Sequence, residues 1–270
     1  MAEIPQLEEC TIVGVFGPVS SGKSFLLEQW FNRMIRAIYV DSTFACRDEQ
    51  MAEHIWGNPQ QLAMRLKQNE YHYRIAYHPK NAVSGYYWCG NMIWQCQQPR
   101  WIIVDEVHQT CARQSVDDTM DTMIRYARHN FLGVIGATQR IADVDRLFTD
   151  NSRMTILFYT EESASLDAIQ DRWGRVVRDE VSHLRPCIYR DDTKQCLQHP
   201  ECVVLVRGRG YRVVALGDLV YNSTDGEQEQ WHSGQQQQMR QQLPSSDSSS
   251  GDLSEREESS PEDTSSPEEQ

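Results

Sequence analysis

The chain has 270 residues and a formal net charge of −13. Residues 222–270 contain twelve Asp or Glu against two Arg, so this segment carries −10 and residues 1–221 carry only −3. A uniformly acidic protein would argue against nucleic acid as a partner, but a nearly neutral folded part does not. No apolar run approaches the roughly 18 residues that a membrane-spanning helix requires.

Strand-like and helix-like segments alternate along the chain. Apolar, β-branched runs predict strands at 11–16, 37–42, 71–79, 101–106, 131–138 and 154–160. Apolar residues at helical spacing predict helices at 22–38, 48–56, 59–69, 114–129, 142–148 and 163–182. Residues 202–216 read as a hairpin that turns at the sequence RGRG. The alternation predicts an α/β fold, with a mostly parallel sheet flanked by helices and a C-terminal β-hairpin.

The end of the chain differs in composition from the rest. Residues 222–270 are rich in Ser, Gln and Glu and hold few sizeable apolar residues. Such a segment cannot bury enough apolar surface to offset its ordering entropy, so we expect a disordered acidic tail. Residues 1–221 then form one domain. Scattered cysteines without a CxxC pair, and no signal-peptide pattern, predict a cytoplasmic protein with free thiols.

The stretch GPVSSGKS follows the first predicted strand and opens the first predicted helix. Glycines at its ends let the backbone approach phosphate oxygens, and the loop amides and helix N-terminus offer donors to an anion. Lys23 would reach the β- and γ-phosphates of ATP, and the Ser24 hydroxyl would bind Mg²⁺. The alternative is a glycine turn without a ligand. The predicted nucleotide-binding residues are Gly17, Pro18, Val19, Ser20, Ser21, Gly22, Lys23 and Ser24.

Two carboxylates follow the apolar strand in WIIVDEVH. Asp105 is placed to support Mg²⁺, and Glu106 to orient or deprotonate an attacking water. The alternative is an acidic pair in a solvated loop. Further along, the strand in GVIGATQR ends beside Gln139. If this strand neighbours the phosphate-loop strand, the Gln139 amide can sense the γ-phosphate or the attacking water.

The pattern ATQR, then a helix of apolar and Asp residues, then Asn and a strand ending in Phe, resembles the HerA/FtsK superfamily of DNA-pumping ATPases. The resemblance spans roughly residues 10–185 and is most specific at 17–24, 101–106 and 136–158. It implies a RecA-like core of the ASCE class of P-loop NTPases, assembled as a ring, usually a hexamer, around DNA. Its site residues match Lys23, Ser24, Asp105, Glu106 and Gln139.

The same resemblance implies an arginine that reaches the γ-phosphate of a neighbouring subunit. In cell-division members it lies near the position of Thr155, where this chain departs from the pattern. The nearest basic residue is Arg153, and Arg140 is the alternative. Either could instead be an ordinary surface arginine.

A compact chain without a membrane segment resembles, within this superfamily, the genome-packaging ATPases of tailless double-stranded DNA viruses. The resemblance implies a motor that pumps duplex DNA into a preformed capsid, in the host cytoplasm or the virion. Such a motor needs cations against DNA phosphates. Candidates are Arg172, Arg175 and Arg178, the pair Arg125 and Arg128, and the RGRG turn, each alternatively a solvated polar face. The tail could dock on capsid or portal-vertex proteins, or only aid solubility.

Four residues of zinc-ligand type lie within sixteen positions near the predicted hairpin. Their spacing is C-x₈-C-x₂-H-x₂-C, in which the two-residue separations suit a zinc knuckle but the usual paired CxxC is missing. The alternative is a set of buried or free thiols. The residues are Cys187, Cys196, His199 and Cys202.

Two other functions fit parts of the sequence. The phosphate loop and the following Asp-Glu pair also resemble type II thymidine kinases, in which Glu106 would activate a nucleoside 5′-hydroxyl. Against this, the cysteine cluster lacks two CxxC pairs, and the segment after Gln139 follows the translocase pattern better. A third possibility is a nucleotide-gated scaffold with negligible turnover, which an intact Glu106 argues against.

Overall fold

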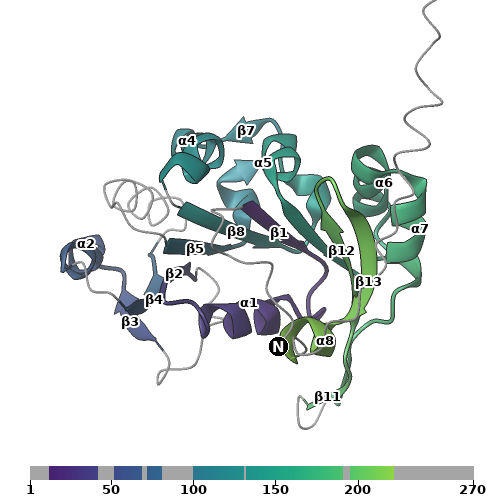
Figure 1. Cartoon of the computed structure of the whole chain (residues 1–270), viewed down its shortest axis with the longest axis horizontal. Helices are drawn as coiled ribbons and strands as arrows, with labels where there is room; N and C mark the ends of the chain where they lie inside the picture. Colours follow the sequence, from purple (N-terminus) through teal and green to yellow (C-terminus); the bar gives the residue numbers. More distant parts are fainter. Residues whose placement is uncertain are drawn as a thin grey trace, which may run out of the picture. The chain divides into compact units, whose positions relative to one another are not determined.

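A computed structural model describes residues 12–41, 52–68, 72–80, 100–130, 132–190 and 195–221. Its main feature is a nine-stranded sheet, counted over these ranges, with the order β13-β12-β9-β1-β8-β5-β2-β4-β3 (Figure 1). The strands are β1 Ile12–Phe16, β2 Arg36–Val40, β3 Glu53–Trp56, β4 Tyr73–His78, β5 Arg100–Asp105, β8 Leu132–Thr138, β9 Met154–Phe158, β12 Glu201–Val206 and β13 Gly210–Ala215. The predicted tail, 222–270, lies outside the described residues.

Seven of these strands are parallel, and β12 and β13 are antiparallel additions beside β9. Strand β8 lies between β1 and β5, so the carboxyl ends of these three strands meet at one edge of the sheet. Two small ribbons lie outside the sheet, β6 Cys111–Ala112 with β7 Ser115–Val116, and β10 Ile188–Arg190 with β11 Gln195–Gln198. The predicted α/β fold with a mostly parallel sheet is confirmed.

Helices cover both faces of the sheet (Figure 1). One face packs against α1 and α8 through side chains such as Leu27, Trp30 and Leu219. The other face packs against the remaining helices through side chains such as Met120, Phe148 and Val177. The helices are α1 Lys23–Phe31, α2 Pro59–Lys67, α4 Asp118–Tyr126, α5 Arg146–Asn151, α6 Ser163–Trp173, α7 Arg175–His183 and α8 Leu216–Tyr221, with short 3₁₀ turns η1 Val107–Gln109, η2 Ala127–Asn130 and η3 Ile141–Asp143.

Two glycines in neighbouring strands fix the position of α5. Gly14 of β1 pairs with Gly136 of β8, and the fully buried ring of Phe148 packs over both. A Cβ at Gly136 would lie 2.5 Å from Cζ of Phe148. The missing side chains therefore make the space for Phe148, which holds α5 against the two strands that lead to the candidate site.

Several predicted helices differ from the structure. The helix predicted for 22–38 ends at Phe31, because 36–40 form strand β2. The helix predicted for 48–56 is wrong over 53–56, which form strand β3, and 48–51 lie outside the described residues. In both cases burial against neighbouring strands overrides the helical spacing of apolar residues.

Three further helices are placed differently from the prediction. The segment 114–129 begins with the ribbon strand β7, and its helix α4 starts only at Asp118, after the capping side chain of Asp117. The segment 142–148 contains the turn η3 and the start of α5, which Asp145 caps. The helix predicted for 163–182 is two helices, because Gly174 adopts φ 89° and ψ 169° between α6 and α7. No helix among the described ranges is long and apolar enough to cross a membrane.

Candidate active site

The loop between β1 and α1 requires its two glycines. Gly22 has φ 102°, and a Cβ there would lie 2.7 Å from Cδ2 of Leu216 in α8. A Cβ at Gly17 would lie 2.6 Å from Cβ of Phe158 at the end of β9. The loop backbone is therefore packed closely against β9 and α8, in a conformation that L-residues rarely adopt.

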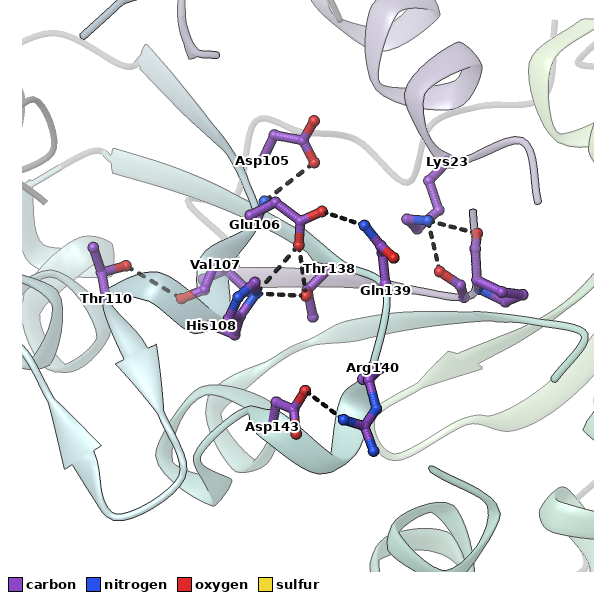
Figure 2. Close-up of polar contacts among 12 residues, drawn as sticks. Lys23, Asp105, Glu106, Val107, His108, Thr110, Thr138, Gln139, Arg140 and Asp143 are labelled. Atoms are coloured by element: carbon purple, nitrogen blue, oxygen red, sulfur yellow. Dashed lines mark hydrogen bonds and ion pairs between the residues drawn. The ribbon is translucent and has the colours of Figure 1, made fainter. Parts of the chain in front are cut away.

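Lys23 lies almost fully buried beneath this loop. Its Nζ donates to the carbonyl oxygens of Gly17 at 2.6 Å and Pro18 at 2.8 Å (Figure 2). Burial lowers the pKa of the Lys23 ammonium, while the nearby charges of Asp105 and Glu106 oppose that shift. The result is a desolvated cation at the carboxyl edge of the sheet, with two carboxylates close enough to influence it.

The two carboxylates come from the end of β5. Both side chains are largely buried, Asp105 at 8% and Glu106 at 9% exposure. Glu106 has φ 58° and ψ 51°, a left-handed conformation that is uncommon for a residue other than glycine. Asp105 Oδ1 accepts a hydrogen bond from the backbone N of Glu106 at 3.1 Å. Such strained backbone is typical of functional sites, where the surroundings hold the residue in place.

The Glu106 carboxylate is held by side chains from β8 and from the turn η1 (Figure 2). Gln139 Nε2 donates to Oε1 at 2.9 Å, and Thr138 Oγ1 donates to Oε2 at 2.9 Å. His108 Nδ1 lies 3.2 Å from the same Oε2 and 2.8 Å from Thr138 Oγ1. One carboxylate therefore has three polar partners.

These contacts define the tautomer of His108. The Thr138 hydroxyl has a single proton, and it donates that proton to Glu106. Its oxygen must then accept from His108, so His108 carries a proton on Nδ1. Neither His108 nor Thr138 was predicted from the sequence. The only signal was their position. His108 lies two residues after Glu106, and Thr138 lies one residue before Gln139.

The structure brings together the residues that the three motifs predicted. Lys23 follows β1, the Asp105–Glu106 pair ends β5, and Gln139 follows the intervening strand β8. Figure 2 shows Gln139 between Glu106 and Lys23. The exposed side chain of Ser24 lies at the first turn of α1. The backbone of Gly17 is tied to β8 by a hydrogen bond from its N to Thr138 O at 3.3 Å.

The two candidate arginines lie at opposite edges of the sheet. Arg140 follows β8 at the carboxyl edge, where it pairs with Glu162 and lies 3.5 Å from Asp143. Arg153 precedes β9 at the amino edge, where its backbone N donates to Ile12 O at 2.8 Å. Five residues of strand span about 16 Å. Arg153 is therefore too far from Lys23 to serve the site of its own subunit.

Of the arginines predicted to contact DNA, Arg172 has a structural role. Its guanidinium donates to the carbonyl oxygens of Ile141 at 3.3 Å and Val144 at 2.7 Å, which fastens α6 to the turn after β8. Burial lowers its pKa. Arg175 and Arg178 both lie against Asp179, at 3.5 and 3.3 Å. Arg125 pairs with Asp121, and the side chain of Arg128 lies outside the described part.

The cysteine and histidine cluster does not gather in the described part of the chain. There, no three His, Cys, Asp or Glu side chains come close enough to hold a metal ion. Cys202 lies fully buried between β9 and β13, and this burial raises the pKa of its thiol to about 12. His199 is exposed beside Gly217. The side chain of Cys196 is not among those described, so the zinc site stays a prediction.

Solved structures with this fold include three of one viral protein. The genome-packaging NTPase B204 from Sulfolobus turreted icosahedral virus 2, in complex with AMP, is 18% identical with a TM-score of 0.61, over 75% of this chain and 96% of B204. Its complex with AMPPCP is 18% identical to this chain with a TM-score of 0.59, over 76% of this chain and 97% of B204. B204 from Sulfolobus turreted icosahedral virus, a DNA-packaging ATPase, is 18% identical with a TM-score of 0.56, over 76% of this chain and 97% of that one.

The chain has the fold of a viral genome-packaging NTPase. The resemblance predicted from the sequence motifs is thereby confirmed at the level of the fold. No protein-family profile and no curated protein sequence matches the chain.

Proposed function

We propose that this protein is an ATPase that translocates double-stranded DNA, and that it packages a viral genome into a preformed capsid. The observation that carries the proposal is the 2.9 Å hydrogen bond between Gln139 and Glu106, at the edge where Lys23 is buried. A base and a γ-phosphate sensor in direct contact are suited to hydrolysis that responds to the bound nucleotide. The fold shared with the packaging NTPase B204 supports the same function.

The residues of the loop fit a nucleotide triphosphate. The glycine backbone leaves no room for a Cβ, Lys23 presents a buried ammonium, and the buried Ser21 Oγ has no hydrogen-bond partner among the described residues. Ser24 and Asp105 are the residues that would hold Mg²⁺. When bound, Mg²⁺ neutralises charge on the β- and γ-phosphates. Lys23 would exchange its two carbonyl partners for phosphate oxygens.

Glu106 would act as the base for the attacking water. A carboxylate oxygen that accepts from Gln139 is partly blocked from accepting a proton from water. Gln139 would therefore turn from Glu106 to the γ-phosphate before Glu106 Oε1 can act. Thr138 and His108 would keep the other oxygen in place during this exchange. The bond between Gln139 and Glu106 is then the resting arrangement of the site.

The proposal includes a ring, most simply a hexamer, around the duplex. Arg153 points to such an assembly, because it lies at the edge of the sheet away from the site of its own subunit. Arg140 is a less suitable trans-acting arginine, because Glu162 and Asp143 already engage its guanidinium. The acidic tail would dock on capsid or portal-vertex proteins, in the host cytoplasm or the virion.

The test is phosphate release from ATP with and without duplex DNA, beside phosphate transfer to thymidine. We expect DNA to stimulate release and thymidine to remain unmodified. Replacement Glu106→Gln should lower turnover by about 10²- to 10⁴-fold while ATP still binds, because the base is lost but the loop is intact. The matched control is Glu161→Gln at the same edge, which should turn over normally.

Phosphorylated thymidine without free phosphate would establish the kinase instead. Wild-type turnover that DNA does not change would contradict translocation. Normal turnover in Glu106→Gln would remove Glu106 from the reaction.

A further inference from the structure

The hairpin of β12 and β13 ends in two exposed arginines at the amino edge of the sheet. Arg207 and Arg209 flank Gly208, which has φ 80° and open space where a Cβ would lie. The backbone N of Arg207 donates to Arg153 O at 2.9 Å. Figure 1 shows this turn at the end of the sheet where β1 begins. We call Arg207 and Arg209 the arginine tip.

Arg207 and Arg209 differ from several other surface arginines in their pairing, although the exposed Arg33 and Arg113 also form no ion pair within the described ranges. An acidic side chain lies within ion-pair distance of the guanidinium at five surface arginines, namely Arg65–Glu53, Arg125–Asp121, Arg146–Asp171, Arg175–Asp179 and Arg185–Glu201. Arg207 and Arg209 form no ion pair with any residue that the structure describes. Two like charges at one turn repel each other, so they contribute nothing evident to folding. An anionic partner would relieve that repulsion.

The basic character continues along the same edge. A pocket of about 520 Å³ lies at the starts of β2, β3 and β4; its lining includes Arg33, Arg65 and Arg74, together with Glu53, which pairs with Arg65. The carboxyl edge carries the buried acids Asp105 and Glu106 instead. The amino edge therefore offers cationic side chains to a polyanion.

We infer that the arginine tip binds the phosphate backbone of duplex DNA, at the edge of the sheet opposite the ATP site. This inference rests on the proposed function and names the surface that meets the DNA. Guanidinium groups pair with phosphates in bidentate geometry, and contacts of this kind do not read base sequence. A motor that moves along any sequence needs such contacts.

The tip also has a direct structural link to the phosphate loop. Strand β12 pairs with β9, and β9 runs from Met154 to Phe158 beside β1. Phe158 packs against Gly17, because a Cβ on that glycine would lie 2.6 Å from Phe158 Cβ. A single strand therefore connects the DNA-binding end to the loop that would hold the phosphates.

The experiment compares the double variant Arg207→Gln/Arg209→Gln with the matched control Arg146→Gln/Arg185→Gln, whose arginines are exposed but paired with acids. Affinity for duplex DNA is measured across salt concentrations, and ATPase activity is measured with and without DNA. We expect the tip variant to lose affinity and its slope of log affinity against log salt to fall by about two, because two phosphate contacts are removed. The ATPase rate of the tip variant without DNA should stay at the wild-type level, as should the DNA affinity and the ATPase rates of the control.

Unchanged DNA affinity in the tip variant would overturn the inference. A loss of DNA-free ATPase activity in a folded tip variant would also overturn it, because the tip would then serve a neighbouring active site. Melting temperatures of both variants establish that they fold. If the wild-type protein binds DNA but DNA does not stimulate its ATPase activity, the proposed function fails. The DNA affinities of the wild type and the tip variant then still test the inference about the tip.

Discussion

Glu106 is the residue on which the candidate site depends. The left-handed backbone conformation of Glu106 directs its carboxylate toward Thr138 and Gln139. His108, in the turn that follows, contacts the same carboxylate. The motifs predicted Glu106 and Gln139 from their positions after two strands. They could not predict His108, because its contact exists only once the chain turns sharply at Glu106 and brings residue 108 back to β8.

At this scale we predict that His108 positions Glu106. Replacement His108→Ala removes the Nδ1 donor and should lower kcat by about tenfold to a hundredfold, since small displacements of reacting groups have effects of that size. KM for ATP should change little, because His108 does not contact the phosphate loop. His108→Asn keeps a donor near the same place and should restore most of the rate.

Steady-state kinetics of both variants check this role. The control is His129→Ala, which alters an exposed histidine on η2. Wild-type kcat in His108→Ala, or an equal loss in His108→Asn, would contradict positioning through the donated hydrogen bond.

Among the elements, strands were predicted better than helices. The buried parallel strands β1, β5, β8 and β9 are short apolar runs, and their burial on both faces makes the pattern unambiguous. Helix ends depend on features that apolar spacing does not carry. The capping side chains of Asp117 and Asp145 and the break at Gly174 determine where α4, α5 and α7 begin.

The glycines at element boundaries give a prediction about stability. Gly22→Ala introduces a Cβ at positive φ and also against Leu216, whereas Gly174→Ala meets open space and has only the backbone cost. The backbone cost is about 1–3 kcal/mol at either position. Gly22→Ala should therefore be the more destabilising change, and it should also weaken ATP binding.

Urea unfolding of the two glycine variants measures the difference, with ATP affinity as a second readout. An equal loss of unfolding free energy at both positions would show that contact with α8 does not restrict the phosphate loop.

For the whole molecule, the directions of the strands place two groups of residues at opposite edges of the sheet. The candidate active site lies at the carboxyl edge, and the arginine tip lies at the amino edge of the same sheet. The sequence motifs identified the first group because each follows its own strand. Counting arginines gave three groups of candidate DNA contacts, on 163–182, at Arg125 and Arg128, and at the RGRG turn, without distinguishing among them. Only the structure reveals that Arg172 binds backbone carbonyls, that Asp179 neighbours Arg175 and Arg178, and that the hairpin tip has no such acid among the described residues.

The central claim is that Lys23, Asp105, Glu106 and Gln139 surround one γ-phosphate. A crystal structure with Mg²⁺ and a non-hydrolysable ATP analogue tests it most directly. We predict that Lys23 Nζ leaves the carbonyl oxygens of Gly17 and Pro18 for phosphate oxygens, and that the Gln139 amide turns from Glu106 to the γ-phosphate. A nucleotide bound away from Lys23, or a γ-phosphate beyond the reach of both Glu106 and Gln139, would contradict the account.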